Sequence, residues 1–336
     1  MYIPHLIYCG FSVLQTMVRY TTAIRGISMN TERFTFTGSG NAKLSAAIWM
    51  PDGQPKAILQ IAHGMTEHIG RYDKLAETLT AQGVVVAGFD LRGHGRNSGD
   101  AHIASFGEGG WEKALEDIHL FFAELEKRWP GVPHFMLGFS LGSFLLREYL
   151  GQYDDKVTGA IILGTGHQPG LVLSIMCAIV KSQIKKSGFD GTTPLVQKLS
   201  FETYNQKFEP NRTASDWLCA DEAQLDLYIK DELCREHISS GLFWELLSAM
   251  KRTGAKDAYQ SWRKDMPVLL ISGQEDPVGD SGKGVQRVDA AMRKAGMNNV
   301  QMKLFSGARH DLLHEEVSGS AEEARKLMVE WMNKNV

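Results

Sequence analysis

The sequence predicts a doubly wound α/β fold, and two observations lead to this class. Six short segments are apolar along their whole length, as strands buried on both faces of a parallel sheet are. Segments with the apolar spacing of helices lie between most of them. Such an alternation is typical of an open parallel sheet with helices on both faces. The six strands are expected at residues 57–62, 84–89, 134–139, 159–163, 267–272 and 300–305.

Two further strands are expected before these six. Residues 33–37 alternate apolar and polar side chains, and residues 44–50 do so again. A glycine-containing turn at residues 38–41 separates them, which predicts an antiparallel pair. The prediction is therefore an eight-stranded, mostly parallel sheet. The helices that cover it are expected at residues 71–82, 111–128, 143–153, 284–295 and 321–333.

The alternation is interrupted in residues 165–262. This segment has no clear strand, but residues 171–186, 225–233 and 242–251 have helical patterns. A loop of this length without its own structure is uncommon in a compact domain, so we expect an inserted helical subdomain. Because it follows a strand of the parallel sheet, it should cover the site as a lid. The predicted division is a core of residues 31–164 and 263–336, a lid of residues 165–262 and an N-terminal extension of residues 1–30.

The N-terminal extension is expected to lie outside the fold. Residues 1–18 are apolar but lack the basic start and the cleavage site of a signal peptide. They are marginal as a membrane span, because polar residues such as His5 and Gln15 interrupt them. Three interpretations stay open: an upstream extension that the cell does not use, which we favour, a membrane-surface anchor, and a degenerate signal. Met17 and Met29 are alternative start positions.

The composition of the 336 residues is that of an ordinary globular protein, with 43% hydrophobic and 22% charged residues. The formal net charge is −3 and no long basic run occurs, so nucleic acid is not expected as a partner. Cys9, Cys177, Cys219 and Cys234 lack the spacing of a metal site. We therefore expect reduced thiols, a cytoplasmic location, no metal and no cofactor.

The most informative motif is Gly138-Phe139-Ser140-Leu141-Gly142, which joins a predicted strand to a predicted helix. A serine on such a sharp turn needs glycines two residues before and after it, because a Cβ atom there would collide with neighbouring backbone. The turn lifts the serine hydroxyl out of the sheet. Ser140 is therefore the predicted nucleophile of an acyl-transfer reaction.

A serine nucleophile needs a base and an orienting acid. Asp276 comes after the strand at residues 267–272, and His310 comes after the strand at residues 300–305. Carboxyl ends of parallel strands meet at one edge of the sheet, so both side chains are expected beside Ser140. His314 is the alternative base, and Glu275 and Asp280 are the alternative acids.

Two backbone N–H groups are predicted to bind the oxyanion of the reaction. One belongs to Leu141, the residue after the nucleophile, and the other to Met65, in the loop after the first buried strand. His63 in that loop is interpreted as a structural hydrogen-bonding residue. The glycine-rich segment 90–95 has no phosphate-binding pattern and is interpreted as a loop that braces the site.

Five segments together resemble the monoacylglycerol lipase and lysophospholipase branch of the α/β-hydrolases. The resemblance covers the chain from about residue 31 to its C-terminus, and residues 211–234 of the predicted lid are also similar. It implies the α/β-hydrolase fold, with the same nucleophile, acid, base and oxyanion donors that the strand ends indicate. The five segments are HGMTEHIGRYDKLA at residues 63–76, DLRGHG at 90–95, GFSLGS at 138–143, GQEDPVGDSGKGV at 273–285 and GARHDLLHE at 307–315.

The predicted activity is hydrolysis of carboxylesters through an acyl-enzyme. The apolar residues 171–180 of the lid favour a single-chain fatty acyl ester, such as a monoacylglycerol or a lysophospholipid, and a transient contact with a membrane or micelle. The net charge slightly favours a neutral headgroup. Two alternatives stay open: a non-catalytic lipid-binding protein, and an aminopeptidase or amide hydrolase. In an aminopeptidase, the substrate amine would be held by Asp221, Glu222 and Asp226.

Overall fold

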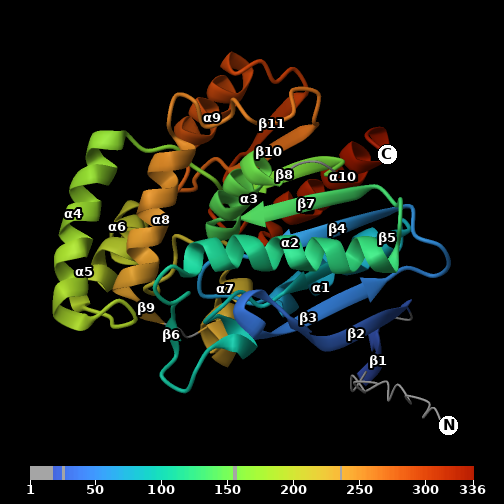
Figure 1. Ribbon diagram of the computed structural model, residues 1–336, viewed down its shortest axis with the longest axis horizontal. Helices are drawn as coiled ribbons and strands as arrows, with labels where there is room; N and C mark the ends of the chain where they lie inside the picture. Colours follow the sequence, from blue (N-terminus) through green and yellow to red (C-terminus); the bar gives the residue numbers. More distant parts are fainter. Residues whose placement is uncertain (1–17, 25–26, 154–156, 235–236) are drawn as a thin grey trace, which may run out of the picture.

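The computed structural model describes residues 18–24, 27–153, 157–234 and 237–336 (Figure 1). Residues 1–17 and 25–26, which make up most of the predicted N-terminal extension, lie outside the described residues. The rest of the chain forms a central sheet with helices on both faces and a group of helices at one end (Figure 1).

A nine-stranded sheet forms the centre of the described structure. The pairs at the β1 end, as far as β3 and β5, are antiparallel, and all later pairs are parallel. The predicted mostly parallel sheet is confirmed, and β1 adds an edge strand. In order across the sheet the strands are β1 (Val18–Ile24), β2 (Ile27–Thr37), β3 (Lys43–Met50), β5 (Val84–Phe89), β4 (Ala57–Ala62), β7 (His134–Phe139), β8 (Gly159–Leu163), β10 (Val268–Gly273) and β11 (Val300–Phe305).

Helices cover both faces of the sheet and enclose two hydrophobic cores. On one face lie α2 (Gly110–Arg128), α3 (Leu141–Gln152) and α9 (Lys283–Lys294), and on the other α1 (Asp73–Thr80) and α10 (Ser320–Lys334). β4 shows why the inner strands are apolar throughout. Ile58 packs in the first core, whereas Leu59 and Ile61 pack in the second. Gln60 is the polar exception in this strand: its Nε2 donates a hydrogen bond to the Ile118 carbonyl of α2 (3.0 Å), whereas its Oε1 has no partner among the described residues.

Two helices near the site begin at different residues than the sequence pattern predicts. α3 starts at Leu141, directly after the serine, although the apolar spacing begins at Ser143. α1 starts at Asp73 because the preceding residues Ile69–Tyr72 form a 3₁₀ turn. In both places the chain tightens where it leaves the carboxyl end of a strand, a feature that apolar spacing does not report.

Residues 165–262, called the insertion below, connect β8 to its sheet neighbour β10. Most of its helices stand together at the end of the sheet toward which β7 points (Figure 1). The insertion also holds the two-residue strand β9 (His237–Ile238), which pairs with β6 (Ile103–Ala104) of the core and was not predicted. Its helices are α4 (Gly170–Ser187), α5 (Pro194–Gln197), α6 (Thr203–Asn205), α7 (Glu222–Lys230) and α8 (Ser240–Thr253). No helix in the described part of the chain is both long and apolar enough to cross a membrane.

A buried carboxylate lies where α8 meets the start of α2. Glu245 is 5% exposed, and its Oε1 accepts a hydrogen bond from the Trp111 N–H (3.3 Å). Its other oxygen has no hydrogen-bond partner among the described residues. Burial raises the pKa of Glu245 to about 7, and the nearby N–H and Arg252 only partly oppose this effect.

Replacing this carboxylate should make stability less sensitive to pH. Unfolded Glu245 ionises near its ordinary pKa of 4.5, but the folded protein holds the proton until about pH 7, so stability falls as pH rises through this window. Glu245→Gln removes that loss. The free energy of unfolding of Glu245→Gln relative to wild type should therefore grow by about 2 kcal/mol across the window and then stay constant. Urea unfolding at pH 5 and pH 8 measures this change, and parallel pH dependences would contradict it.

Candidate active site

Ser140 lies on a sharp turn between β7 and α3, with φ of 49° and ψ of −116°. A non-glycine residue with positive φ is uncommon and costs about 1 kcal/mol or more. The flanking glycines make the turn possible. A Cβ at Gly142 would lie 2.0 Å from the Ala62 carbonyl oxygen, and a Cβ at Gly138 would lie 2.4 Å from the Gly142 oxygen. The glycine spacing is thus a packing requirement.

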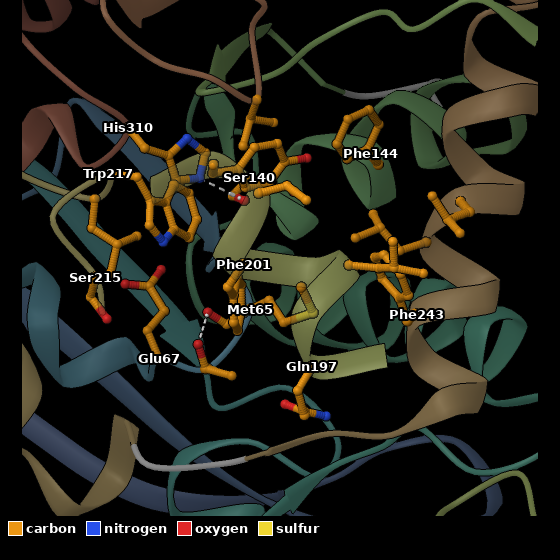
Figure 2. A pocket seen from close by; sticks show the side chains of 18 of the residues that line it. Met65, Glu67, Ser140, Phe144, Gln197, Phe201, Ser215, Trp217, Phe243 and His310 are labelled. Carbon is orange, nitrogen blue, oxygen red and sulfur yellow. Dashed lines mark hydrogen bonds between the residues drawn. The ribbon is translucent and has the colours of Figure 1, made fainter. Parts of the chain in front are cut away.

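The structure brings Ser140, His310 and Asp276 together. His310 Nε2 is 2.9 Å from Ser140 Oγ, and the two side chains point toward each other (Figure 2). His310 Nδ1 is 2.9 Å from Asp276 Oδ1, although its N–H is not aimed straight at that oxygen. Hydrogen bonds in a ligand-free site are often poorly aligned and tighten when substrate binds. The arrangement matches a serine, a base and an orienting acid.

Asp276 is fully buried behind His310. Its Oδ1 accepts a hydrogen bond from the Val278 N–H (2.8 Å), and its Oδ2 accepts one from Ser272 Oγ (3.0 Å). These donors come from the end of β10 and from the loop that follows it. They fix the orientation of the carboxylate, which in turn limits the orientation of the imidazole.

Two aromatic rings enclose the His310 imidazole. The Phe139 ring centroid is 4.9 Å away and the Trp217 ring centroid is 5.1 Å away. Phe139 precedes Ser140 at the end of β7, whereas Trp217 comes from the insertion. The insertion therefore forms one wall around the base, a role that no sequence motif indicated.

The alternative site residues lie in other contacts. His314 Nδ1 is 2.8 Å from Asp311 Oδ1, and its Nε2 is 3.2 Å from the Arg71 carbonyl oxygen. Glu275 and Asp280 each pair with a cationic side chain, at 2.9 and 3.1 Å. The imidazole that contacts Ser140 is that of His310.

The structure describes the surroundings of the two backbone N–H groups that the sequence predicts as oxyanion donors. Leu141 is the first residue of α3, where an N–H has no carbonyl one turn back. The Gly64–Met65 peptide is held through its carbonyl oxygen, 2.7 Å from His63 Nδ1. The C=O and N–H of a trans peptide point in opposite directions, so the Met65 N–H faces away from His63. Neither N–H has a protein acceptor within the described ranges of the chain.

His63 is a fully buried hydrogen-bonding residue, as interpreted from the sequence. Its Nε2 accepts a hydrogen bond from the Leu91 N–H (2.8 Å), so its proton sits on Nδ1 and is donated to Gly64. Burial lowers the pKa of His63 and keeps the ring neutral. Segment 90–95 also braces this loop, because Asp90 Oδ1 accepts a hydrogen bond from the Ile69 N–H (2.9 Å).

A cavity of about 500 Å³ lies above Ser140 (Figure 2). On one side, Phe144 and Phe243 point into it, and on the other side lie Ser215 and Glu67 (Figure 2). Helices α4 and α8 supply much of the apolar side. The apolar lining residues of the whole cavity include Phe144, Val172, Leu173, Met176, Leu199, Phe201, Phe243, Leu246, Leu247 and Met250. The more polar lining residues include Thr66, Glu67, Arg71, Ser215, Tyr228 and His237.

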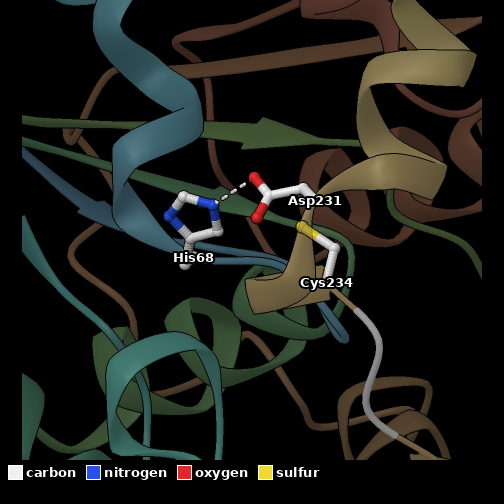
Figure 3. A group of neighbouring side chains, drawn as sticks. All are labelled: His68, Asp231 and Cys234. Carbon is white, nitrogen blue, oxygen red and sulfur yellow. Dashed lines mark hydrogen bonds and ion pairs between the residues drawn. The ribbon is translucent and has the colours of Figure 1, made fainter.

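His68, Asp231 and Cys234 form a second cluster, whose possible ligand atoms lie within 4.8 Å of one another (Figure 3). His68 Nδ1 accepts a hydrogen bond from the Gly70 N–H (3.1 Å), so the ring proton is on Nε2, 2.8 Å from Asp231 Oδ2. A metal ion bound to Nε2 would require the ring proton to sit on Nδ1. That N–H would then face the Gly70 N–H, donor against donor. The donor set therefore suits a hydrogen-bonded pair that joins the core to the insertion.

A serine on a strand-to-helix turn, facing a histidine at the carboxyl end of a mostly parallel sheet, defines the class of the α/β hydrolases. Residues 53–317 match the family model of the serine aminopeptidases, S33 (Hydrolase_4). The chain belongs to this family and is a hydrolase. The resemblance stated from the sequence motifs is confirmed.

Curated relatives agree with this assignment. The chain is 26% identical over 279 residues to monoglyceride lipase of Mus musculus, covering 82% of this chain and 81% of the relative. It is 28% identical over 280 residues to monoglyceride lipase of Homo sapiens, with the same two shares.

Two solved structures have the same fold. A thermostable carboxyl esterase from Bacillus coagulans aligns with a TM-score of 0.83 and 23% identity, covering 91% of this chain and 98% of the other. A monoacylglycerol lipase from Paleococcus ferrophilus aligns with a TM-score of 0.65 and 24% identity, covering 88% of this chain and 100% of the other.

The close approach at Gly142 leads to a stability prediction. Alanine is favoured over glycine in a helix by about 1 kcal/mol, but the Cβ of Gly142→Ala would lie 2.0 Å from a backbone oxygen that cannot move aside easily. We expect a net loss of more than about 2 kcal/mol, measured by urea unfolding. Gly99→Ala is the control, because nothing lies within 4 Å of its Cβ position. Equal stability of the two variants would contradict the packing argument.

Proposed function

We propose that the protein is a serine carboxylester hydrolase for single-chain fatty acyl esters. Ser140 is its nucleophile, His310 its base and Asp276 the acid that orients the base. The observation that carries the proposal is the 2.9 Å contact of Ser140 Oγ with His310 Nε2 beside a cavity that is apolar on one side. The similarity to monoglyceride lipases supports the same reaction class.

The proposed reaction has two steps. In the first, Ser140 Oγ bonds to the ester carbonyl carbon while His310 Nε2 takes the hydroxyl proton, and the C–O bond to the alcohol then breaks as His310 protonates the leaving oxygen. In the second, a water molecule attacks the acyl-enzyme, again with His310 as base, and releases the fatty acid and Ser140. Asp276 stabilises the imidazolium formed in each step.

The N–H groups of Leu141 and Met65 are proposed to bind the oxyanion of both tetrahedral intermediates. Both are backbone groups in a largely enclosed site, so they need no rearrangement as negative charge develops. His63 supports this role, because its Nδ1 holds the Gly64 carbonyl and so directs the Met65 N–H away from itself.

The insertion is proposed to act as a lid that holds the acyl chain. Its helices α4 and α8 contribute Leu173, Met176, Phe243, Leu246 and other apolar side chains to the cavity. Burying an alkyl chain there is favourable by about 0.8 kcal/mol per CH₂ group. This apolar surface supports a fatty acyl ester over a short, polar ester.

The charges that line the cavity support a neutral headgroup. Arg71 lines the polar side, but its guanidinium pairs with Glu67 and Asp311, each at 2.6 Å. A phosphate would therefore compete with two carboxylates for this cation. We propose monoacylglycerol as the preferred substrate and a lysophospholipid as a poorer one.

The three acidic residues that the aminopeptidase alternative would use lie outside the cavity lining. Asp221, Glu222 and Asp226 do not line the cavity. Asp221 caps the start of α7, and Asp226 pairs with Arg212 at 2.7 Å. The described residues thus support an ester substrate rather than a peptide with a free N-terminal amine.

A transient contact of the lid with a membrane or micelle is proposed for α4. Leu171, Val172 and Ile175 on this helix are 75%, 46% and 55% exposed, and Val172 also lines the cavity. An exposed apolar patch at a cavity mouth suits uptake of a lipid from an interface. We further propose a cytoplasmic location, which the free thiols of Cys177 and Cys219 support.

Removal of the proposed base should abolish turnover. His310→Ala is expected to lower kcat about 10³-fold or more, because Ser140 loses its proton acceptor. His314→Ala should keep most of the activity on p-nitrophenyl octanoate, since its imidazole does not contact Ser140. Labelling by a fluorophosphonate probe should occur in wild type and disappear in Ser140→Ala. If His310→Ala kept a rate near that of wild type, His314 would be the base. If folded wild type were not labelled by the fluorophosphonate, a lipid-binding protein would be favoured.

The proposed substrate class predicts an order of activities. kcat/KM should be highest for a long-chain monoacylglycerol, about 10-fold or more lower for a lysophosphatidic acid, and negligible for prolyl-nitroanilide. Hydrolysis of the anilide alone would overturn the ester proposal.

The proposed membrane contact of α4 predicts a second difference. With monoacylglycerol presented in phosphatidylcholine vesicles, Ile175→Ser should lower the rate of hydrolysis. The same variant should hydrolyse a dispersed short ester at the wild-type rate. An equal loss of rate on the vesicles and on the dispersed ester would contradict the membrane contact.

A further inference from the structure

Arg71 contacts three separate parts of the chain that surround the proposed site. It lies in the 3₁₀ turn before α1, and its side chain is 10% exposed. Nη1 is 2.6 Å from Glu67 Oε2, and Nη2 is 2.6 Å from Asp311 Oδ2. The guanidinium also lies 5.0 Å from the ring centroid of Tyr228 in α7. One cation thus joins the loop after β4, the loop after β11 and the insertion.

The Glu67 contact reaches the Met65 loop. Glu67 Oε1 accepts hydrogen bonds from the Gly64 N–H (2.6 Å) and from the Tyr72 hydroxyl (2.9 Å). Its carboxylate is almost fully buried, so these donors and Arg71 satisfy a charge that has little access to water. Glu67 therefore fixes the N–H of the residue just before Met65.

The Asp311 contact reaches the proposed base, because Asp311 directly follows His310 in the chain. Burial alone would raise the pKa of Asp311, but Arg71 and His314 beside it hold that pKa well below its ordinary value. The Asp311 N–H also donates to the Leu218 carbonyl oxygen of the insertion (2.7 Å). Arg71 thus stabilises the carboxylate of the residue that directly follows His310.

The Tyr228 contact reaches the Met65 loop from the opposite side. Thr66 has a φ of 54°, an unusual value for a β-branched residue. Its hydroxyl donates to the Met65 carbonyl oxygen (2.8 Å) and lies 2.9 Å from the Tyr228 hydroxyl. Tyr228 therefore holds Thr66 in place and packs on Arg71. The His68–Asp231 pair fastens the same end of α7 to the same loop (Figure 3).

We propose that Arg71 is a positioning residue for ester hydrolysis, one that sets the Met65 N–H and His310 at their working places around Ser140. This inference rests on the proposed function. Without Arg71, two buried carboxylates on the two loops would repel each other and move the loops apart. Lysine cannot replace it, because an ammonium group is a single point charge whereas the planar guanidinium binds two carboxylates at fixed angles.

The test compares Arg71→Lys with Arg128→Lys. Arg128 is a matched control outside the cavity lining, because it also bridges two carboxylates, of Glu32 and Glu124, each at 3.0 Å. It also packs on an aromatic ring, with 4.6 Å to the Phe34 centroid. Both variants keep the positive charge and lose one guanidinium bridge. The measurements are kcat and KM on p-nitrophenyl octanoate and the dissociation constant of octylboronic acid, which forms a tetrahedral adduct with a serine nucleophile.

For Arg71→Lys we expect kcat to fall by about 10- to 100-fold, with KM changed by less than about threefold. The boronic acid should bind more weakly by a similar factor, because its adduct needs both the oxyanion donors and His310. Arg128→Lys should match wild type in all three quantities. Unchanged kcat in folded Arg71→Lys, or an equal loss in both variants, would overturn the inference.

Glu67→Gln decides the question if Arg71→Lys does not fold. Its Oε1 can still accept the Gly64 N–H, but the ion pair with Arg71 is lost, so kcat and boronic acid affinity should again fall together. A folded Glu67→Gln protein with wild-type kcat would overturn the inference. Wild type that neither turns over the ester nor reacts with a fluorophosphonate would instead overturn the proposed function.

Discussion

The contact of Gly142 with the end of β4 is the constraint on which the rest of the site depends. α3 can start beside the Ala62 carbonyl oxygen only because residue 142 has no side chain. This approach places Ser140 and the first N–H of α3 next to the loop that leaves β4, the loop that carries Met65. The Ser140 N–H also donates to the Leu163 carbonyl oxygen of β8 (3.0 Å), so the turn is tied to a third strand. One backbone packing thus assembles the hydroxyl and both N–H groups.

Most of the core was predictable because its signal is local. Strands buried on both faces are apolar at every position, and this pattern located β4, β5, β7 and β8 at their observed bounds. The positions of Asp276 and His310 followed from topology, because parallel strands end at one edge. The sequence already favoured His310 over His314, and the structure adds the side-chain directions, because His310 and not His314 contacts Ser140.

Other features had no local signal. β6 and β9 are two residues each, too short for an alternating pattern, and they pair across more than a hundred residues. β1 (Val18–Ile24) falls within the predicted N-terminal extension of residues 1–30, where no strand was expected. Trp217, Tyr228 and Arg71 contact the site through side chains far apart in sequence. Such contacts depend on how the insertion packs on the core, which periodicity and spacing do not determine.

The fastening of the insertion determines which part of it is free to move. The segment around Leu218 is bonded to the His310 loop, Asp231 is bonded to His68, and β9 is bonded to β6. The first half of α4 is held differently. Its polar contact with α8 is long, with 3.9 Å between Cys177 Sγ and Ser248 Oγ. Swinging the whole insertion outward would break many hydrogen bonds around the imidazole, whereas tilting α4 would disturb mainly its apolar packing on α8. We therefore expect the first half of α4 to shift more easily than the segment around Leu218, which would leave the contacts of His310 in place.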